Sequence, residues 1–430
     1  MLETVSKSNS ERPLKRKGRA TRAAILDAAH EVFKSTGYYG SSISEITRRC
    51  GFSMGTFYNY FKNKEQVFLA LNDEIVSRFR KRIEASPPTD LKFEERLRRV
   101  VRLLLDHTRD NFAFHRILGE SELIDGVTIA YYDAITQYYR DFFHREAQSG
   151  NIHPLDPDLL AYGLTGVCYF HSLDWGTGES PDQDALVDGI TDLVINGISG
   201  SKQWNIPKEQ DIFSLPAPVP LHTDDHAPLT KGEKTRQFIL NAAEKVIGRH
   251  GINRASISEI TREAGVAQGT FYIHFSSKSD LLEEFVRYIN HEMRREIQRF
   301  VAGVGDRRDA ERVGMRVFFR FIRQHRQIYR VVPECEMISR GVALWYYQTL
   351  AKGYVEGLKE GIRRGDIRDI PAPFAARSLM GLIHFVGLKK IIWSPDPEAD
   401  MDRRLFGDLT RFVLFGLKGS RAGVDFSVDT

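Results

Sequence analysis

Two short stretches of the chain present the same set of hydrogen-bonding side chains. They are Gly55-Thr56-Phe57-Tyr58 and Gly269-Thr270-Phe271-Tyr272, and a lysine, Lys64 or Lys278, follows each at the start of a helical pattern. Hydroxyl groups, a lysine ammonium and the positive end of a helix are all groups that bind phosphate oxygens. The predicted chemistry is therefore phosphate recognition.

The two stretches belong to a long internal repeat. Residues 17–64 reappear without a gap at 231–278, shifted by 214 positions, and about half of the aligned residues are identical. A weaker correspondence continues beyond them, where Gly150-Asn151-Ile152 pairs with Gly365-Asp366-Ile367, now 215 positions apart. Solenoid repeats run ~20–50 residues, so this period indicates a duplicated domain.

Each repeat reads as three short helices followed by a longer one. A helical pattern begins at Thr21 and closes at Gly37. Ser42, with Glu45 three residues later, has the spacing of a capping box, and the copy keeps it. A glycine turn at Gly51 then joins the second predicted helix to the third. Two helices joined by such a turn predict a helix-turn-helix head.

Composition favours a protein of several ordinary domains. The chain has 430 residues, 42% of them hydrophobic and 27% charged, and a net charge of +4. Its three cysteines are dispersed, which predicts a reducing cytoplasmic location with neither disulfides nor a zinc site. We found no apolar run long enough for a membrane span and no secretory signal, so no membrane partner is expected.

The remainder of each half shows helical periodicity without strand alternation, so the predicted fold class is all-α. Between the copies lies a proline-rich segment typical of an extended linker. The predicted domains are a disordered basic arm (1–16), a first head (17–64), a first helical body (65–200), the linker (201–230), a second head (231–278) and a second helical body (279–420).

Both heads resemble the tetracycline-repressor (TetR) family of bacterial transcriptional regulators. The matching string is Gly-Thr-Phe-Tyr-x-(Tyr/His)-Phe-x-x-Lys, at 55–64 and again at 269–278. The resemblance implies that three helices bind double-stranded DNA, that the middle helices enclose a ligand, and that the last two helices form a four-helix dimerisation bundle. Here those would be 156–175 with 184–199 and 373–393 with 400–418. The resemblance thus implies an intramolecular pseudo-dimer, with further pairing of two chains left open.

Glycines in the last helices suit either close helix approach or kinks, and the sequence leaves both open. The glycines concerned are Gly163, Gly166, Gly381 and Gly387.

In a helix-turn-helix the second helix of the pair lies in the major groove. Carried over residue by residue, the expected DNA contacts are Arg19, Thr47, Arg48, Ser53, Met54, Thr56, Tyr58, Tyr60 and Lys64 in the first head, and Thr261, Arg262, Ala267, Gln268, Thr270, Tyr272, His274 and Lys278 in the second. Phe57 and Phe61 are instead expected in the core. Because Met54 becomes Gln268, and glutamine can read adenine where methionine offers only apolar contact, we expect an operator with two unlike halves.

The helical bodies are rich in aromatic residues at helical spacing. Such residues are core first, and a cavity for a small lipophilic effector is the alternative. The residues that would line it are Phe112, Phe114, Tyr131, Tyr139, Tyr329, Trp345 and Tyr346. The sequence names no effector.

The favoured interpretation is a ligand-responsive regulator, of which a repressor is the expected type, without cofactor or metal. The alternative is a small-molecule or partner-binding helical protein whose DNA heads have become weak and non-specific. An enzyme is disfavoured. His171 and Asp174 share a helix face, but no nucleophile motif, metal cluster or phosphate loop accompanies them, so they read as structural.

Overall fold

The computed structural model of the chain confirms the all-α prediction. It describes residues 16–85, 91–120, 126–173, 182–204, 212–216, 230–329 and 339–419. Within those ranges the chain is helical, without strands, and one isolated antiparallel bridge joins Ser199 to Ile367. Residues 1–81 and residues 82–430 form two compact units. Most of the predicted basic arm lies outside the described residues.

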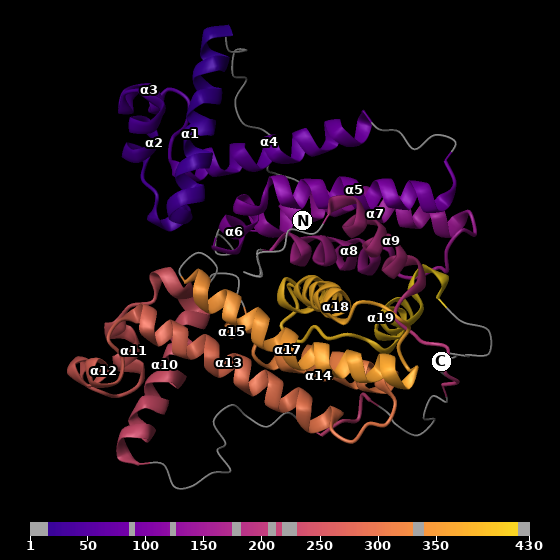
Figure 1. Cartoon of the computed structure of the whole chain (residues 1–430). Coiled ribbons are helices and arrows are strands. Elements are labelled where there is room, and N and C mark those ends of the chain that lie inside the picture. Colours follow the sequence, from indigo (N-terminus) through magenta and orange to yellow (C-terminus); the bar gives the residue numbers. More distant parts are fainter. Residues whose placement is uncertain are drawn as a thin grey trace. The chain divides into compact units, whose positions relative to one another are not determined.

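The first half of the chain forms nine helices within the described residues (Figure 1). They are α1 (Arg16–Gly40), α2 (Ile43–Cys50), α3 (Met54–Tyr58), α4 (Lys64–Glu84), α5 (Phe93–Asp110), α6 (Phe112–Glu120), α7 (Val127–Gln148), α8 (Pro157–Ser172) and α9 (Gln183–Asn196). The helical turns of α1 are interrupted at Gly37, whose φ of 75° lies in the left-handed region that glycine tolerates.

The second half repeats this order. Its helices are α10 (Lys231–Arg254), α11 (Ile257–Glu263), α12 (Gln268–His274), α13 (Lys278–Val301), α14 (Arg307–Gln324), α15 (Arg326–Tyr329), α17 (Arg340–Arg364), α18 (Ala372–Gly387), the π-turn η1 (Leu388–Ile392), α19 (Arg403–Phe415) and the short 3₁₀ turn η2 (Gly416–Lys418). Gly251, the counterpart of Gly37, breaks α10 with a φ of 73°.

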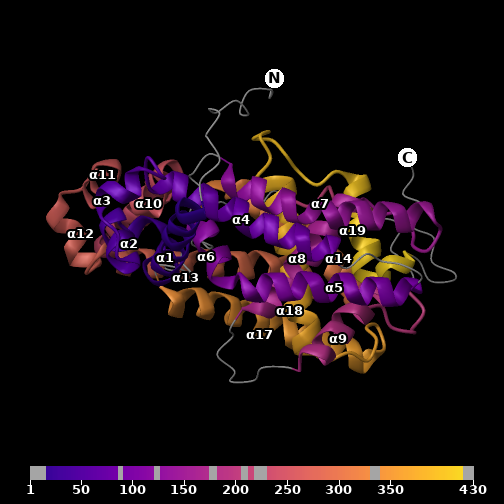
Figure 2. The ribbon, with the colours of Figure 1, turned by 90° about the horizontal axis from the view of Figure 1, so that it is seen from above.

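The two halves pair with each other through α8 and α18, which lie side by side in both views (Figures 1 and 2). The helices cross where Gly166 meets Gly381. A Cβ atom added to Gly166 would lie 2.0 Å from the Gly381 carbonyl oxygen, and one added to Gly381 would lie 2.2 Å from the Gly166 carbonyl oxygen. Only glycine permits this approach, so the close-approach interpretation is confirmed at this pair.

The other two glycines fit less tightly against backbone. A Cβ at Gly163 would come no closer than 3.3 Å to the side chain of Leu382, and one at Gly387 would meet the side chain of Ile322 at 2.6 Å. The helices predicted for the bundle, α8, α9, α18 and α19, lie close to their expected bounds. Among their glycines, Gly166 and Gly381 set the separation between α8 and α18.

Ion pairs and stacked rings also join the halves across this surface. Lys389 Nζ lies 2.7 Å from a carboxylate oxygen of Asp133, and Lys390 Nζ lies 2.8 Å from one of Asp158. The rings of Tyr132 and Trp393 stack with centroids 5.4 Å apart. These ion pairs and the ring contact join residues of the first half to residues of the second half.

The described parts of the linker pack against the second body. Trp204 is buried, its indole N–H donates to Asp309 at 3.3 Å, and the guanidinium of Arg308 lies over its ring at 5.2 Å. Further along, the ring of Phe213 lies beneath the guanidinium of Arg316 at 4.4 Å. The linker is therefore anchored at two points, which the sequence-based expectation of an extended spacer did not include.

Candidate functional site

Each head is built on local capping contacts that the sequence encodes. In the first head the Ser42 hydroxyl accepts from the backbone N–H of Glu45 at 3.1 Å, and Gly51 ends α2 with a φ of 71°. Ser53 then caps α3, because its hydroxyl accepts from the Thr56 N–H at 3.1 Å. These contacts fix the turn that presents α3.

The second head repeats this frame with two differences. Ser256 and Glu259 form the complete capping box, since the serine hydroxyl accepts from the Glu259 N–H at 3.2 Å and the glutamate accepts from the Ser256 N–H at 3.1 Å. Ala267 stands where Ser53 caps α3, so α12 begins without a side-chain cap.

The third helix of each head divides cleanly into a buried and an exposed face. Phe57 and Phe61 are buried, as are their counterparts Phe271 and Phe275, which confirms the prediction that they are core. The exposed fractions of Met54, Tyr58 and Tyr272 are 41%, 51% and 54%. Large apolar and aromatic groups at such exposure are available to a partner surface. Ser53, Ala267 and Gln268 are also exposed, and Thr56, Tyr60, Thr270 and His274 are half-buried.

The predicted contacts from the second helix separate into two kinds. Arg48 and Arg262 are exposed, as is Arg19 on α1. Thr47 and Thr261 are buried, and their hydroxyls donate to backbone carbonyls of their own helices at 3.0 and 3.2 Å. The threonines thus contribute to the core of each head, so the phosphate contact proposed for this helix rests on the arginines.

Lys64 and Lys278 occupy identical positions in the two heads. The Lys64 ammonium donates to the carbonyl oxygens of Tyr38 at 2.5 Å and Ser41 at 2.9 Å. The Lys278 ammonium donates to those of Ile252 and Ala255, the same two positions in the repeat, at 2.9 and 3.0 Å. In each head, therefore, the lysine holds the end of the first helix against the fourth, a role that its predicted phosphate contact did not include.

We expect Lys64→Met to loosen the first head by about 2 kcal/mol, because hydrogen bonds from a charged donor are among the stronger ones and both carbonyls would lose theirs. Hydrogen exchange at the carboxyl end of α1 should accelerate, and Lys278→Met should do the same for α10. Unchanged exchange together with lost DNA affinity would instead assign the lysine to phosphate alone.

Sequence reasoning missed two features of the heads. The guanidinium of Arg22 lies over the Phe61 ring at 5.3 Å, and that of Arg236 lies over the Phe275 ring at 5.2 Å. Ile273 has 78% of its surface exposed on α12, where the first head has Asn59. Only the repeat signals the arginine–phenylalanine contact, since Arg22 and Phe61 recur as Arg236 and Phe275, 214 residues later.

His171 lies at the crossing of the two halves. Its Nε2 atom is 2.8 Å from the Ser378 hydroxyl on α18, and burial lowers its pKa to about 3. Asp174, its predicted neighbour, lies outside the described residues. A neutral histidine bonded to a serine across the helix interface is a packing group.

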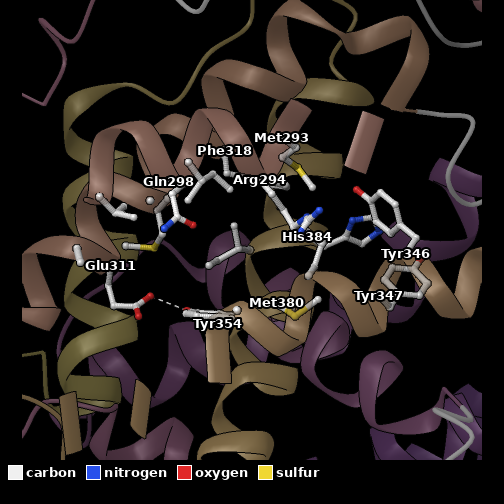
Figure 3. Close-up of a pocket in the computed structure, with 18 of the residues that line it drawn as sticks. Met293, Arg294, Gln298, Glu311, Phe318, Tyr346, Tyr347, Tyr354, Met380 and His384 are labelled. Carbon is white, nitrogen blue, oxygen red and sulfur yellow. Dashed lines mark hydrogen bonds between the residues drawn. The ribbon is translucent and has the colours of Figure 1, made fainter. Parts of the chain in front are cut away.

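The second helical body encloses a cavity of about 260 Å³. Helices α13, α14, α17 and α18 supply most of its wall, α15 contributes Tyr329, and Phe170 of α8 reaches it from the first half (Figure 3). Most of the lining is apolar. Figure 3 draws Arg294, His384 and Tyr346 toward one end and the hydrogen-bonded pair Glu311 and Tyr354 at the other.

The predicted ligand residues are distributed unevenly around this cavity. Tyr329 and Tyr346 line it, whereas Trp345 lies outside the lining with the Arg287 guanidinium 4.5 Å above its ring. The residues of the first half pack among their own neighbours. Phe114, Tyr131 and Tyr139 are fully buried, and Phe112 is half-buried with its ring centroid 6.2 Å from that of Tyr169.

Two equivalent tyrosines differ in their hydrogen bonding. The Tyr131 hydroxyl lies 2.8 Å from Nε2 of His107. Its counterpart, the buried Tyr346 hydroxyl, has no hydrogen-bond partner in the described part of the chain, because Phe321 stands where the first half has His107. Burial raises the pKa of both phenols, so both stay neutral.

The two tyrosines should therefore respond oppositely to the same substitution. Tyr131→Phe should lower the free energy of unfolding by about 1–3 kcal/mol, because a buried hydrogen bond is removed. Tyr346→Phe should leave it unchanged or raise it, because a buried hydroxyl without a partner is removed. Parallel thermal melts measure both, and equal losses would contradict the difference between the two environments.

Comparison with known proteins locates the same two heads. The family described as "Bacterial regulatory proteins, tetR family" matches residues 25–71 and 239–285. The chain is a TetR-family regulator with two such units in tandem. The DNA-binding character of the regulator is thus established by both matched domains.

Several curated relatives are similar to parts of the chain. The uncharacterized HTH-type transcriptional regulator YhgD of Bacillus subtilis is 23% identical over 183 residues, which cover 41% of this chain and 96% of YhgD. The HTH-type transcriptional activator FasR of Mycolicibacterium smegmatis is 24% identical, covering 41% of this chain and 83% of FasR. The fatty acid metabolism regulator protein of Bacillus subtilis is 38% identical over 77 residues, 40% of its length.

Among solved structures, the transcriptional regulator FadR from Bacillus subtilis in complex with stearoyl-CoA is 24% identical, covering 40% of this chain and 96% of that one, with a TM-score of 0.36. AibR in complex with isovaleryl coenzyme A and operator DNA is 25% identical, covering 40% of this chain and 97% of that one, with a TM-score of 0.35.

None of the described helices has the length and apolar character needed to cross a bilayer.

Proposed function

We propose that this regulator is a ligand-responsive repressor whose two unlike heads read the two halves of one operator. The observation that carries the proposal is the pair of heads itself. They share the serine cap of the second helix, a glycine turn and a lysine that donates to two carbonyl oxygens at the end of the first helix. Their exposed recognition surfaces differ, because Met54 is exposed in one head and Gln268 in the other. A shared frame with different exposed groups is what two unlike half-sites require.

The proposed contacts fall into two classes. Base edges would be met by the residues that begin the third helix, Met54 with Ser53 and Gln268 with Ala267. Phosphates would be met by exposed or half-buried donors, which are Arg19, Arg48, Thr56, Tyr58 and Tyr60 in the first head and Arg262, Thr270, Tyr272 and His274 in the second. Phosphate contacts set position and base contacts set sequence.

The connection between head and cavity supports the response to a ligand. Helix α13 begins at Lys278, in the second head, and its other end supplies Met293 and Val301 to the cavity wall. Helix α10 of that head also packs against α15, which carries the cavity residue Tyr329. A ligand that moves α13 would shift the head, and half-sites about 34–36 Å apart tolerate little displacement.

Sequencing the genomic DNA that the purified protein retains at near-physiological salt tests this function. Enrichment of a few sites with two unlike halves, released when an effector is added, is the expected result. Uniform, salt-sensitive recovery would mean that the heads supply only phosphate binding. The weakened-head alternative would then replace the proposal.

A further inference from the structure

The two helical bodies differ in side-chain size at two equivalent positions. Gly314 on α14 and Gly353 on α17 line the cavity, and a Cβ added to either would have no atom closer than 3.8 Å. The corresponding positions in the first half, 214 and 215 residues earlier, hold Val100 and Tyr138. At these two positions the first half therefore carries a valine and a tyrosine side chain, where the second half has glycines facing the cavity.

The hydrogen bonding of a buried tyrosine hydroxyl also differs between the two halves. In the first half the Tyr131 hydroxyl is satisfied by His107 and also lies 3.5 Å from Nε2 of His115. In the second half the Tyr346 hydroxyl reaches the cavity without a partner among the described residues. A buried hydroxyl without a partner is costly, and a bound ligand is one way to supply it.

The charged side chains that line the cavity carry one more positive charge than negative. Arg307 lies 2.6 Å from the Glu311 carboxylate, so this pair is neutral overall. Burial lowers the pKa of His384 to about 3, which keeps its ring uncharged. Arg294 lines the cavity and is exposed at its mouth, and its Nε atom donates to the amide oxygen of Asn290 at 3.0 Å. Among the ion pairs of the described residues none includes Arg294.

We propose that each chain holds one effector site, in the second half only, and that it takes a small amphipathic anion. The inference rests on the proposed function and names the ligand class for it. The anionic group would lie at the Arg294 guanidinium and accept from the Tyr346 hydroxyl. The apolar part would lie among Met293, Phe318 and Met380, three of the side chains in Figure 3. The cavity volume, below that of most drug-sized pockets, favours a small ligand.

One consequence is that the two halves have different roles in the response to a ligand. The first body, which has Val100 and Tyr138 where the second has glycines, would act as the fixed partner, and the second body would carry the response. Phe170 of the first half lines the cavity next to the helix crossing, so a ligand in the second half also contacts the fixed partner.

Calorimetric titration of the full-length protein with octanoate tests the proposal. We expect one octanoate per chain and weaker or absent binding of 1-octanol, which has no charge. Arg294→Gln should weaken octanoate binding by about tenfold or more, as expected when a charged hydrogen bond is lost. Arg80→Gln, the same change at the equivalent position of the first half, should leave it unchanged. Tyr346→Phe should weaken it severalfold.

A filling variant separates binding from folding. Gly314→Val places in the cavity the side chain that the first half has at Val100, and it should abolish octanoate binding while the thermal melt stays cooperative.

Several outcomes would overturn the proposal. Two equal sites per chain, equal losses from Arg80→Gln and Arg294→Gln, equal binding of octanol, or no octanoate binding at millimolar concentration would each do so. Operator binding, measured without octanoate, reports separately on the proposed function. If the protein binds one octanoate per chain but shows no specific DNA binding, the effector site is supported and the proposed regulatory function is wrong.

Discussion

The Gly166→Ala variant is expected to lose about 3 kcal/mol or more of unfolding free energy, at the upper end of what overpacking costs. The added methyl carbon would lie 2.0 Å from the Gly381 carbonyl oxygen and 2.6 Å from its carbon. Both are backbone atoms of α18, so no side chain can rotate away, and α8 and α18 must separate along their whole contact. Gly381→Ala should be as damaging, because the geometry is reciprocal.

Gly163→Ala is the matched control, one helical turn away on the same helix. There the nearest atom to an added Cβ is a side-chain carbon of Leu382 at 3.3 Å, which a small shift can relieve. Both substitutions gain the same helix propensity, of order 1 kcal/mol, so the difference between them isolates the close approach. Urea denaturation measures both. Similar unfolding free energies for the two variants would show that the helices do not depend on this crossing.

Changing one exposed tyrosine to aspartate in either head should reduce operator affinity by at least about 100-fold. Tyr58 and Tyr272 are half exposed on their recognition helices, so the substitution leaves each head folded and places a carboxylate where phosphate is expected. Two heads on one chain bind as linked sites, and disabling one removes the advantage of the second binding event. Fluorescence anisotropy with the operator recovered from genomic DNA gives the affinities.

Leu69→Asp is the control for the added charge. Leu69 is also exposed, but on α4 instead of the recognition helix, and the same change in net charge there should have a small effect. The melting curve of each variant checks its fold. If Tyr58→Asp and Tyr272→Asp both bind the operator as tightly as the parent protein, the heads do not act together on DNA.

The order of the helices in the heads could be predicted from the sequence because local contacts determine it. The Ser42 and Ser256 hydroxyls each accept from the N–H three residues on, Gly51 ends α2 with a positive φ, and Gly37 interrupts α1 with another. These contacts span only a few residues, so the sequence pattern is sufficient. The repeat adds a second copy of the same pattern, and the order of the helices agrees in both heads.

The roles of particular head residues could not be predicted because they depend on distant segments. Thr47 and Arg48 are neighbours in sequence, yet the threonine is buried and the arginine is exposed. The carbonyl partners of Lys64 lie 23 and 26 residues earlier in the chain. A spacing pattern carries no information about such contacts.

The cavity could not be predicted from the sequence for a different reason. Aromatic residues at helical spacing are compatible with a packed core and with a ligand pocket, and both occur here in equivalent positions. The distinction depends on what stands opposite, such as Gly314 in one half and Val100 in the other. Comparing the two halves position by position would have shown this difference, but only once α14 was known to face the cavity.

The most direct test of the central claim is an operator-symmetry measurement. The affinity of the protein for its natural operator is compared with that for two symmetrised versions, one with the left half twice and one with the right half twice. Two unlike heads on one chain predict that both symmetrised operators bind at least about tenfold more weakly, since mismatched base pairs cost about 1–3 kcal/mol each. A symmetrised operator that binds as tightly as the natural one would contradict the account.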